Sequence, residues 1–212
     1  MRIELTRPWP RVRTAEGLSC GGDQNWFPDR NFRLCGCGVV ACADTLLYLT
    51  GRGELEQEEY ERYVNSLRMY FPLVPHHGID GVRLAIGLNA LLRKRGVRVR
   101  AGWSASGARF WDRLARLLAN DLPAIVAIGP SFPRVWDAER LQLYRRTGGA
   151  YVAAARTKGH FLTVLGLDDD WMRVSSWGQE LYIERRAYAD YMRRQGALFT
   201  NLVYLERMEK QP

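Results

Sequence analysis

The chain has 212 residues, of which 47% are hydrophobic, and its 31 lysines and arginines outnumber 23 aspartates and glutamates. This length fits one domain with its own core, and the hydrophobic content excludes a disordered chain. The longest uninterrupted apolar run, residues 122–129, is too short to cross a bilayer. The N-terminal residues lack the apolar core of a secretion signal, so the sequence predicts a cytoplasmic protein with no membrane partner.

The formal net charge of +8 raises the question of a nucleic-acid partner. The arginines, however, are scattered along the chain and often stand beside glutamate, as in Glu184-Arg185-Arg186. The densest basic stretch, residues 93–100, lies at a predicted helix end, where cations interact favourably with the helix dipole. The charge pattern therefore does not predict binding to nucleic acid.

The four cysteines, Cys20, Cys35, Cys37 and Cys42, all lie in the first fifth of the chain. Their spacing contains no CxxC pair and no nearby histidine, so no metal site is expected. A chain of this size without an export signal is expected to keep its thiols reduced. Cys42 is interpreted as a core residue, and Cys20 as either an unpaired loop thiol or a partner for Cys35.

The elements predicted for the first half are mainly helices. Proline and glycine break any period in roughly the first thirty residues, which are expected to be irregular. A run that is apolar on all sides then predicts a helix buried in the middle of the fold. The expected elements are this helix at 39–49, further helices at 55–71, 81–95 and 106–120, and a strand at 97–103. The expected core face of the helix at 81–95 consists of Val82, Ala85, Ile86, Leu88, Leu91 and Leu92.

The second half is predicted to consist mainly of antiparallel strands joined by tight turns. The expected elements are strands at 123–129, 150–155, 159–167, 171–176, 180–183 and 198–205 and a short helix at 188–193. The sequence thus predicts a single α+β domain over residues 1–212, mostly helical to about residue 120 and mostly β from about residue 121.

Cys37 lies between Gly36 and Gly38 at the start of the predicted buried helix. The positive end of a helix dipole stabilises a thiolate there, and flanking glycines would let a substrate backbone approach closely. Gly-Cys-Gly could equally be a tight turn before a core helix. Among the cysteines, Cys37 is the candidate nucleophile, because Cys35 lacks glycines on both sides.

The candidate bases are the three histidines. His76 and His77 lie in a Pro-His-His-Gly segment and are interpreted as a solvated loop. His160 follows Gly159 at the start of a predicted strand, where its ring could face a cleft. The alternative for His160 is a half-buried imidazole with a purely structural role.

Three motifs occur in the order typical of papain-like cysteine peptidases. They are Gly36-Cys37-Gly38 before a buried helix, Gly159-His160 at the start of a strand, and Val174-Ser-Ser-Trp-Gly178. Over roughly residues 24–178 the chain resembles this family, and most closely its bacterial C39-like branch. The resemblance implies a papain-like fold, in which a helical part carrying the cysteine packs on the antiparallel sheet. It also implies a thiol hydrolase that cleaves a peptide, amide or isopeptide bond of a peptide or protein substrate, without a metal or cofactor.

Carried over position by position, the resemblance makes Cys37 the nucleophile and His160 the general base and later the acid. Gln24 would hold the oxyanion together with the Cys37 amide, although Gln24 stands further from Cys37 than is usual in the family. The remaining expected positions concern substrate binding. They are Trp177, which would also cover the orienting contact of the histidine, and Gly36, Gly38 and Gly159, with cleft walls from Trp26, Phe27 and the loop near Trp136.

The sequence departs from the family where the histidine should meet an asparagine or aspartate. That position holds Ser176, or Ser175 one residue earlier, while Asp168 and its neighbours lie in the preceding turn. A serine hydroxyl can accept a hydrogen bond but carries no charge, so it stabilises an imidazolium less well. Two functions follow: an active thiol hydrolase with weak orientation of the base, or a catalytically impaired papain-like fold that binds peptides or proteins.

Overall fold

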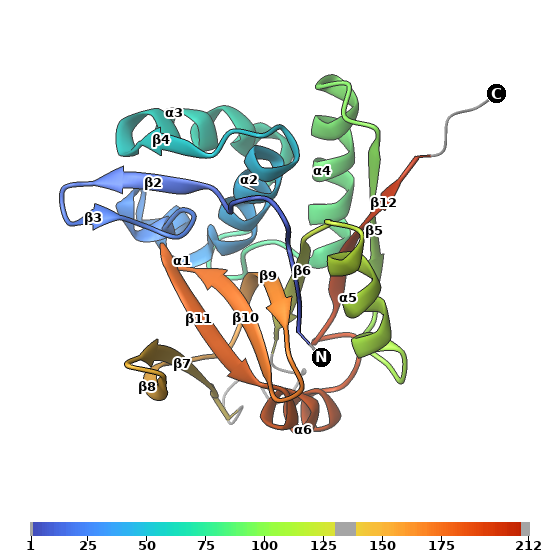
Figure 1. The fold of residues 1–212 in the computed structure, drawn as a ribbon. Coiled ribbons are helices and arrows are strands. Elements are labelled where there is room, and N and C mark those ends of the chain that lie inside the picture. Colours follow the sequence, from blue (N-terminus) through green and yellow to red (C-terminus); the bar gives the residue numbers. More distant parts are fainter. Residues whose placement is uncertain (1, 130–138, 209–212) are drawn as a thin grey trace.

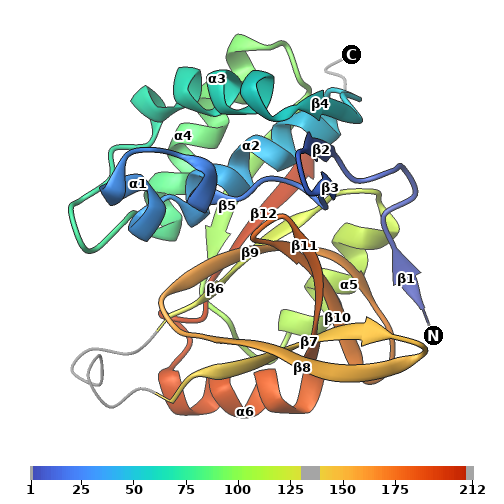
Figure 2. The ribbon, with the colours of Figure 1, turned by 90° about the vertical axis from the view of Figure 1, so that its left-hand side faces the viewer.

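The structure, a computed structural model, describes residues 2–129 and 139–208. Helices α1 to α4 gather in one part of the molecule, and strongly curved strands form most of the other part (Figures 1 and 2). Helix α5 covers the sheet near the N-terminal strand, and α6 lies at the far end of the sheet from α1 to α4 (Figure 2). The predicted α+β class is confirmed by this architecture.

The described residues form six α-helices and two short 3-10 turns. The helices are α1 (Arg30–Cys35), α2 (Cys37–Leu49), α3 (Gln57–Leu67), α4 (Gly81–Lys94), α5 (Phe110–Ala119) and α6 (Arg185–Gln195), and the turns are η1 (Gln24–Trp26) and η2 (Arg68–Tyr70).

Nine of the described strands form one antiparallel sheet in the order β5-β12-β6-β9-β10-β11-β7-β8, with β1 added beside β9. Its strands are β1 (Ile3–Glu4), β5 (Val99–Ser104), β6 (Ala124–Ile128), β7 (Leu141–Thr147), β8 (Ala150–Thr157), β9 (His160–Leu167), β10 (Trp171–Ser176), β11 (Gln179–Glu184) and β12 (Leu202–Arg207). A smaller sheet pairs β2 (Arg11–Thr14) with β3 (Gly17–Leu18) and with β4 (Glu54–Glu56).

Helix α2 runs through the middle of the fold, as its sequence predicts. Eleven of its 13 residues are buried, from Gly38 to Tyr48. One end of the helix packs on β9, while α3 and α4 pack beside it. Every side of an apolar helix is stabilised by removal from water. The other elements therefore pack around α2.

The beginning of the chain is not irregular, as the sequence analysis expected, but contains β1, β2, β3 and the short helix α1. These elements are too short for a periodic pattern to show. Two of the strands also have partners far away in the sequence: β1 pairs with β9, and β2 pairs with β4. Strand β7 was missed for a related reason, since only Leu141 and Leu143 of it are buried.

The sheet draws strands from both halves of the chain. Strand β5 lies in the first half, yet all six of its residues pair with β12 near the C-terminus. The mostly helical and mostly β parts are therefore joined through shared strands rather than through a linker.

The expected core face of α4 is wrong in two positions. Val82 is 45% exposed and Ile86 is 64% exposed, whereas Leu84 is completely buried. Ala85, Leu88, Leu91 and Leu92 are buried as expected. The helix is apolar over more than half its circumference, so periodicity alone could not tell which apolar side faces α2.

No helix in the described ranges is long and apolar enough to span a bilayer.

The burial pattern of α4 predicts different costs for two neighbouring substitutions. Leu84→Ala should lower the free energy of unfolding by about 3 kcal/mol, because it leaves a cavity between α4 and α2. Ile86→Ala, the matched control on the exposed side, should change it by less than about 0.5 kcal/mol. Urea unfolding followed by tryptophan fluorescence measures both, and equal costs would contradict the orientation of α4.

Candidate active site

Cys37 is the first residue of α2 and is partly exposed. Gly36 caps the helix, and a side chain there would lie 2.6 Å from the Phe32 carbonyl oxygen. A side chain at Gly38 would lie 2.9 Å from Leu84. Both glycines are buried. Their lack of a side chain therefore permits close packing of the protein itself.

His160 is the first residue of β9, where it pairs with Ile128 of β6. Its Nε2 lies 2.6 Å from the Ser176 hydroxyl oxygen. Its ring stacks on Trp177, with ring centroids 4.2 Å apart and planes inclined by 20°. Only 6% of His160 is exposed, so Trp177 and the sheet together exclude water from the imidazole.

Trp177 occupies a strained turn. It forms the two-residue loop between β10 and β11 together with Gly178, and the φ angles are +50° and +66°. Two positive φ angles are typical of a type I′ hairpin turn, in which a tryptophan side chain is unfavourable. The neighbouring backbone holds the turn: the Gly178 amide donates to the Gly22 carbonyl (2.9 Å), and the Cys20 amide donates to the Gly178 carbonyl (2.8 Å).

The four expected catalytic residues and Trp177 meet at one cavity of about 10 Å³, which is room for about one water molecule, whereas Gly36, Gly38 and Gly159 are not part of its lining. Its lining includes Cys37, His160, Gln24, Ser176 and Trp177. Gln24 is buried, and its Nε2 donates to the Arg33 carbonyl oxygen at 2.6 Å. This bond uses one of the two amide hydrogens and holds the side chain in place. Gly159 adopts a φ of +66° in the turn before His160.

The structure distinguishes the alternative partners of the histidine. Ser176, and not Ser175, contacts the ring. The Ser175 hydroxyl donates instead to the Cys20 carbonyl at 2.9 Å. Asp168 accepts hydrogen bonds from backbone amides of its own turn. Successive residues of a strand point to opposite sides, which explains why only one of the two serines reaches His160.

Burial favours the neutral forms of both Cys37 and His160. Desolvation raises the pKa of the Cys37 thiol to about 11, although the backbone amides of Phe161 and Gly38 donate toward the sulfur and oppose the rise. Desolvation alone lowers the pKa of His160 to about 3. At neutral pH the site therefore holds a thiol and a neutral imidazole, and not a thiolate–imidazolium pair.

Asp44 lines the same cavity and was not anticipated. It is 2% exposed, and burial raises the pKa of its carboxyl to about 7. The signal was present in the sequence, because Asp44 is the only charged residue in an otherwise apolar helix. A charged residue in a helix buried on all sides must have a specific partner.

The cleft walls expected from Trp26 and Phe27 are not part of the cavity lining. Phe27 is 1% exposed and packs on Phe32 in the core. Trp26 packs edge-on against Tyr60. Trp136 lies outside the described residues.

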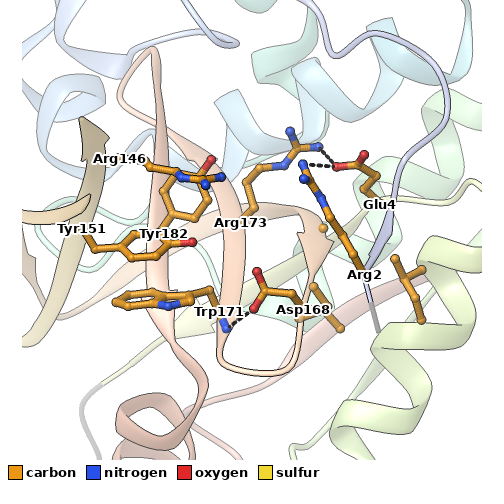
Figure 3. Close-up of a pocket in the computed structure, with 11 residues that line it drawn as sticks. Arg2, Glu4, Arg146, Tyr151, Asp168, Trp171, Arg173 and Tyr182 are labelled. Carbon is orange, nitrogen blue, oxygen red and sulfur yellow. Dashed lines mark hydrogen bonds and ion pairs between the residues drawn. The ribbon is translucent and has the colours of Figure 1, made fainter. Parts of the chain in front are cut away.

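A second hollow lies on the outer face of the sheet (Figure 3). Tyr151 stacks on Trp171 with centroids 3.8 Å apart, and Arg173 forms an ion pair with Glu4 at 3.2 Å. The hollow measures about 30 Å³, enough for one or two water molecules, and neither cysteine nor histidine lines it. The ion pair between Arg173 and Glu4 helps to hold β1 on the sheet. The lining of the hollow offers no thiol or imidazole for nucleophilic chemistry.

All four cysteines are free thiols, so the pairing of Cys20 with Cys35 that the sequence left open does not occur. In the part of the chain that the structure describes, no three histidine, cysteine, aspartate or glutamate side chains are placed to hold a metal ion.

The neutral state of Cys37 and His160 leads to a prediction about the reactivity of the Cys37 thiol. Iodoacetamide should alkylate Cys37 slowly at acidic and neutral pH, and about tenfold faster for each pH unit up to about 9, because only the thiolate reacts. The rate should show no plateau at lower pH, because His160 gains no proton there. Intact-mass spectrometry with peptide mapping measures this, and fast labelling below pH 7 that is lost in His160→Ala would contradict it.

No protein-family model matches the sequence, and no curated protein matches it. Among solved structures, the chain is similar to a "putative C39-like peptidase" from Bacillus anthracis. The two share 12% sequence identity with a TM-score of 0.53, over 99% of this chain and 100% of the other. At such low identity the likeness concerns the fold alone. The chain thus shares the papain-like α+β fold of that protein.

Proposed function

We propose that the protein is a papain-like thiol hydrolase that cleaves a peptide, amide or isopeptide bond. The observation that carries this proposal is that Cys37, at the N-terminus of a buried helix, shares one cavity with His160, whose Nε2 meets Ser176 at 2.6 Å. A nucleophile, a base and a group that orients the base are the three parts that acyl transfer through a thioester requires.

The roles of the two ring nitrogens follow from the Ser176 contact. Nε2 is engaged by the hydroxyl, so Nδ1 is the nitrogen that serves Cys37. When Ser176 accepts a hydrogen bond from Nε2, the lone pair lies on Nδ1, which is the tautomer that a base needs. Stacking under Trp177 keeps the ring in this orientation.

The reaction proceeds in two steps. The Cys37 sulfur attacks the carbonyl carbon while its proton moves to His160, and the C–N bond then breaks as His160 returns that proton to the leaving amine. Water, deprotonated by His160, attacks the resulting thioester, and the carboxylic acid leaves as Cys37 regains its proton. Gln24 and the Cys37 amide donate to the carbonyl oxygen while it carries negative charge. Because the resting pair is neutral, proton transfer accompanies attack.

Replacing the nucleophile tests the proposal. Cys37→Ala should abolish hydrolysis of a peptide library and leave the melting temperature within a few degrees, since it removes a single small atom from the side chain. The matched control is Cys35→Ser, which removes a free, buried thiol two residues away and should keep the activity. Turnover that survives Cys37→Ala, or wild-type protein inactive toward every peptide tested, would contradict the proposal.

A second function is supported by the weak base. The low pKa of His160 and the uncharged Ser176 both reduce proton transfer, and a site impaired in this way would bind a peptide or protein without cleaving it. In that case the wild type and Cys37→Ala should bind the same peptides with equal affinity, and the peptides should be recovered intact by mass spectrometry. Loss of bound peptide over time in the wild type alone would favour the hydrolase.

A further inference from the structure

Asp44 is the one charged residue of α2, and its carboxylate is almost completely buried. The Gly22 amide donates to both of its oxygens, at 3.2 Å and 3.0 Å. The Tyr60 hydroxyl of α3 donates to Oδ1 at 2.7 Å. The carboxylate thus connects the cysteine helix both to α3 and to the loop that precedes η1.

The loop at Gly21 and Gly22 packs closely against its neighbours. A side chain at Gly22 would lie 2.0 Å from the Tyr60 hydroxyl, so the backbone sits directly against the tyrosine. A side chain at Gly21 would lie 2.4 Å from Asp44 Oδ2 and 2.7 Å from the Ser175 hydroxyl. Two consecutive glycines therefore let the backbone pass between the carboxylate, the tyrosine and the sheet.

The loop held by Asp44 also holds the turn over the imidazole. The Gly22 carbonyl accepts from the Gly178 amide, and the Gly178 carbonyl accepts from the Cys20 amide. Gly178 directly follows Trp177, whose ring stacks on His160. Trp177 has a positive φ, a conformation that neighbouring contacts must maintain.

Two parts of the site thus depend on one carboxylate. Gln24 follows Gly22 by two residues and lines the cavity beside Cys37, and Trp177 covers His160. Asp44 itself lines that cavity. A buried carboxylate without compensating hydrogen bonds would be strongly unfavourable, so its contacts with Gly22 and Tyr60 hold firmly.

We propose that Asp44 is a positioning residue of the Cys37–His160 site, which holds Gln24 beside the thiol and Trp177 on the imidazole through the Gly22–Gly178 backbone contact. The proposal rests on the thiol hydrolase function for its effect on turnover, but its effect on the position of Trp177 can be measured without any turnover.

The test is the imidazole signal of His160 in NMR spectra of the full chain. Stacking on Trp177 shifts this signal upfield through the ring current, whereas His76 and His77 lie exposed and provide internal references. Asp44→Ala should move the His160 signal toward the positions of the exposed histidines. It should also lower kcat toward a peptide substrate about ten- to a hundredfold with a smaller change in KM. Asp44→Asn keeps an acceptor for Gly22 and Tyr60 and should retain most of both properties.

Asp121 provides the matched control. It too accepts hydrogen bonds from a tyrosine hydroxyl, that of Tyr48, and from a backbone amide, that of Thr6 at 2.9 Å. Tyr48 follows Cys37 by eleven residues, or about 16 Å along α2. Asp121→Ala should lower the melting temperature and leave the His160 signal in place. An equal shift of that signal in Asp121→Ala would show a general loosening and overturn the proposal.

If Asp44→Ala does not fold, the double variant Asp44→Leu/Tyr60→Phe replaces the buried polar pair by apolar groups of similar size, an exchange that folds tolerate. It should show the same shift of the His160 signal. An unshifted signal in whichever variant folds would overturn the positioning role. A wild type without hydrolase activity, combined with a shifted signal in the variant, would contradict the proposed function and leave the positioning role standing.

Discussion

The structure depends on the burial of α2 on all sides. A helix of thirteen residues with no hydrophilic face requires neighbours around its whole circumference, and α3, α4 and β9 provide them. The same constraint acts on single residues. Gly36 and Gly38 have no room for side chains, and Asp44, the one charged residue, must find its partners inside the protein. The N-terminus of α2 is consequently held at the start of β9, where Cys37 and His160 line a common cavity.

The chemistry of the site follows from the balance between burial and polar contact at the imidazole. Stacking under Trp177 removes water from His160, and the side chain that its Nε2 meets, Ser176, is an uncharged hydroxyl. Both conditions favour the neutral ring. The same lack of water raises the pKa of the Cys37 thiol, although the thiol lies at a helix N-terminus. Desolvation outweighs the helix dipole here, because the dipole contributes at most about 2 kcal/mol, whereas burial shifts a pKa by several units.

Several features of the fold could be predicted because they are properties of neighbouring residues. Helix α2 was expected from its uninterrupted apolar run, and strand β10 matches its expected range of 171–176. The core face of α4 could be predicted only in part, since Val82 and Ile86 are exposed although they are as hydrophobic as the residues that face the core. Strand β7 carries only two buried residues, which leaves it no clear alternating pattern. It forms a hairpin with β8, but its pairing with β11 is a contact between segments distant in the chain.

The sequence by itself determined the class of the fold, the buried cysteine helix, and the order in which a thiol, a histidine and a serine follow one another. These depend on local composition and spacing, which a chain carries whether or not it is folded. Only the tertiary structure decided that Ser176 rather than Ser175 contacts His160, and that Asp44 connects α2 to the loop before Gln24. Both depend on backbones that are distant in the chain and adjacent in space, where a shift of one residue along a strand turns a side chain to the opposite face.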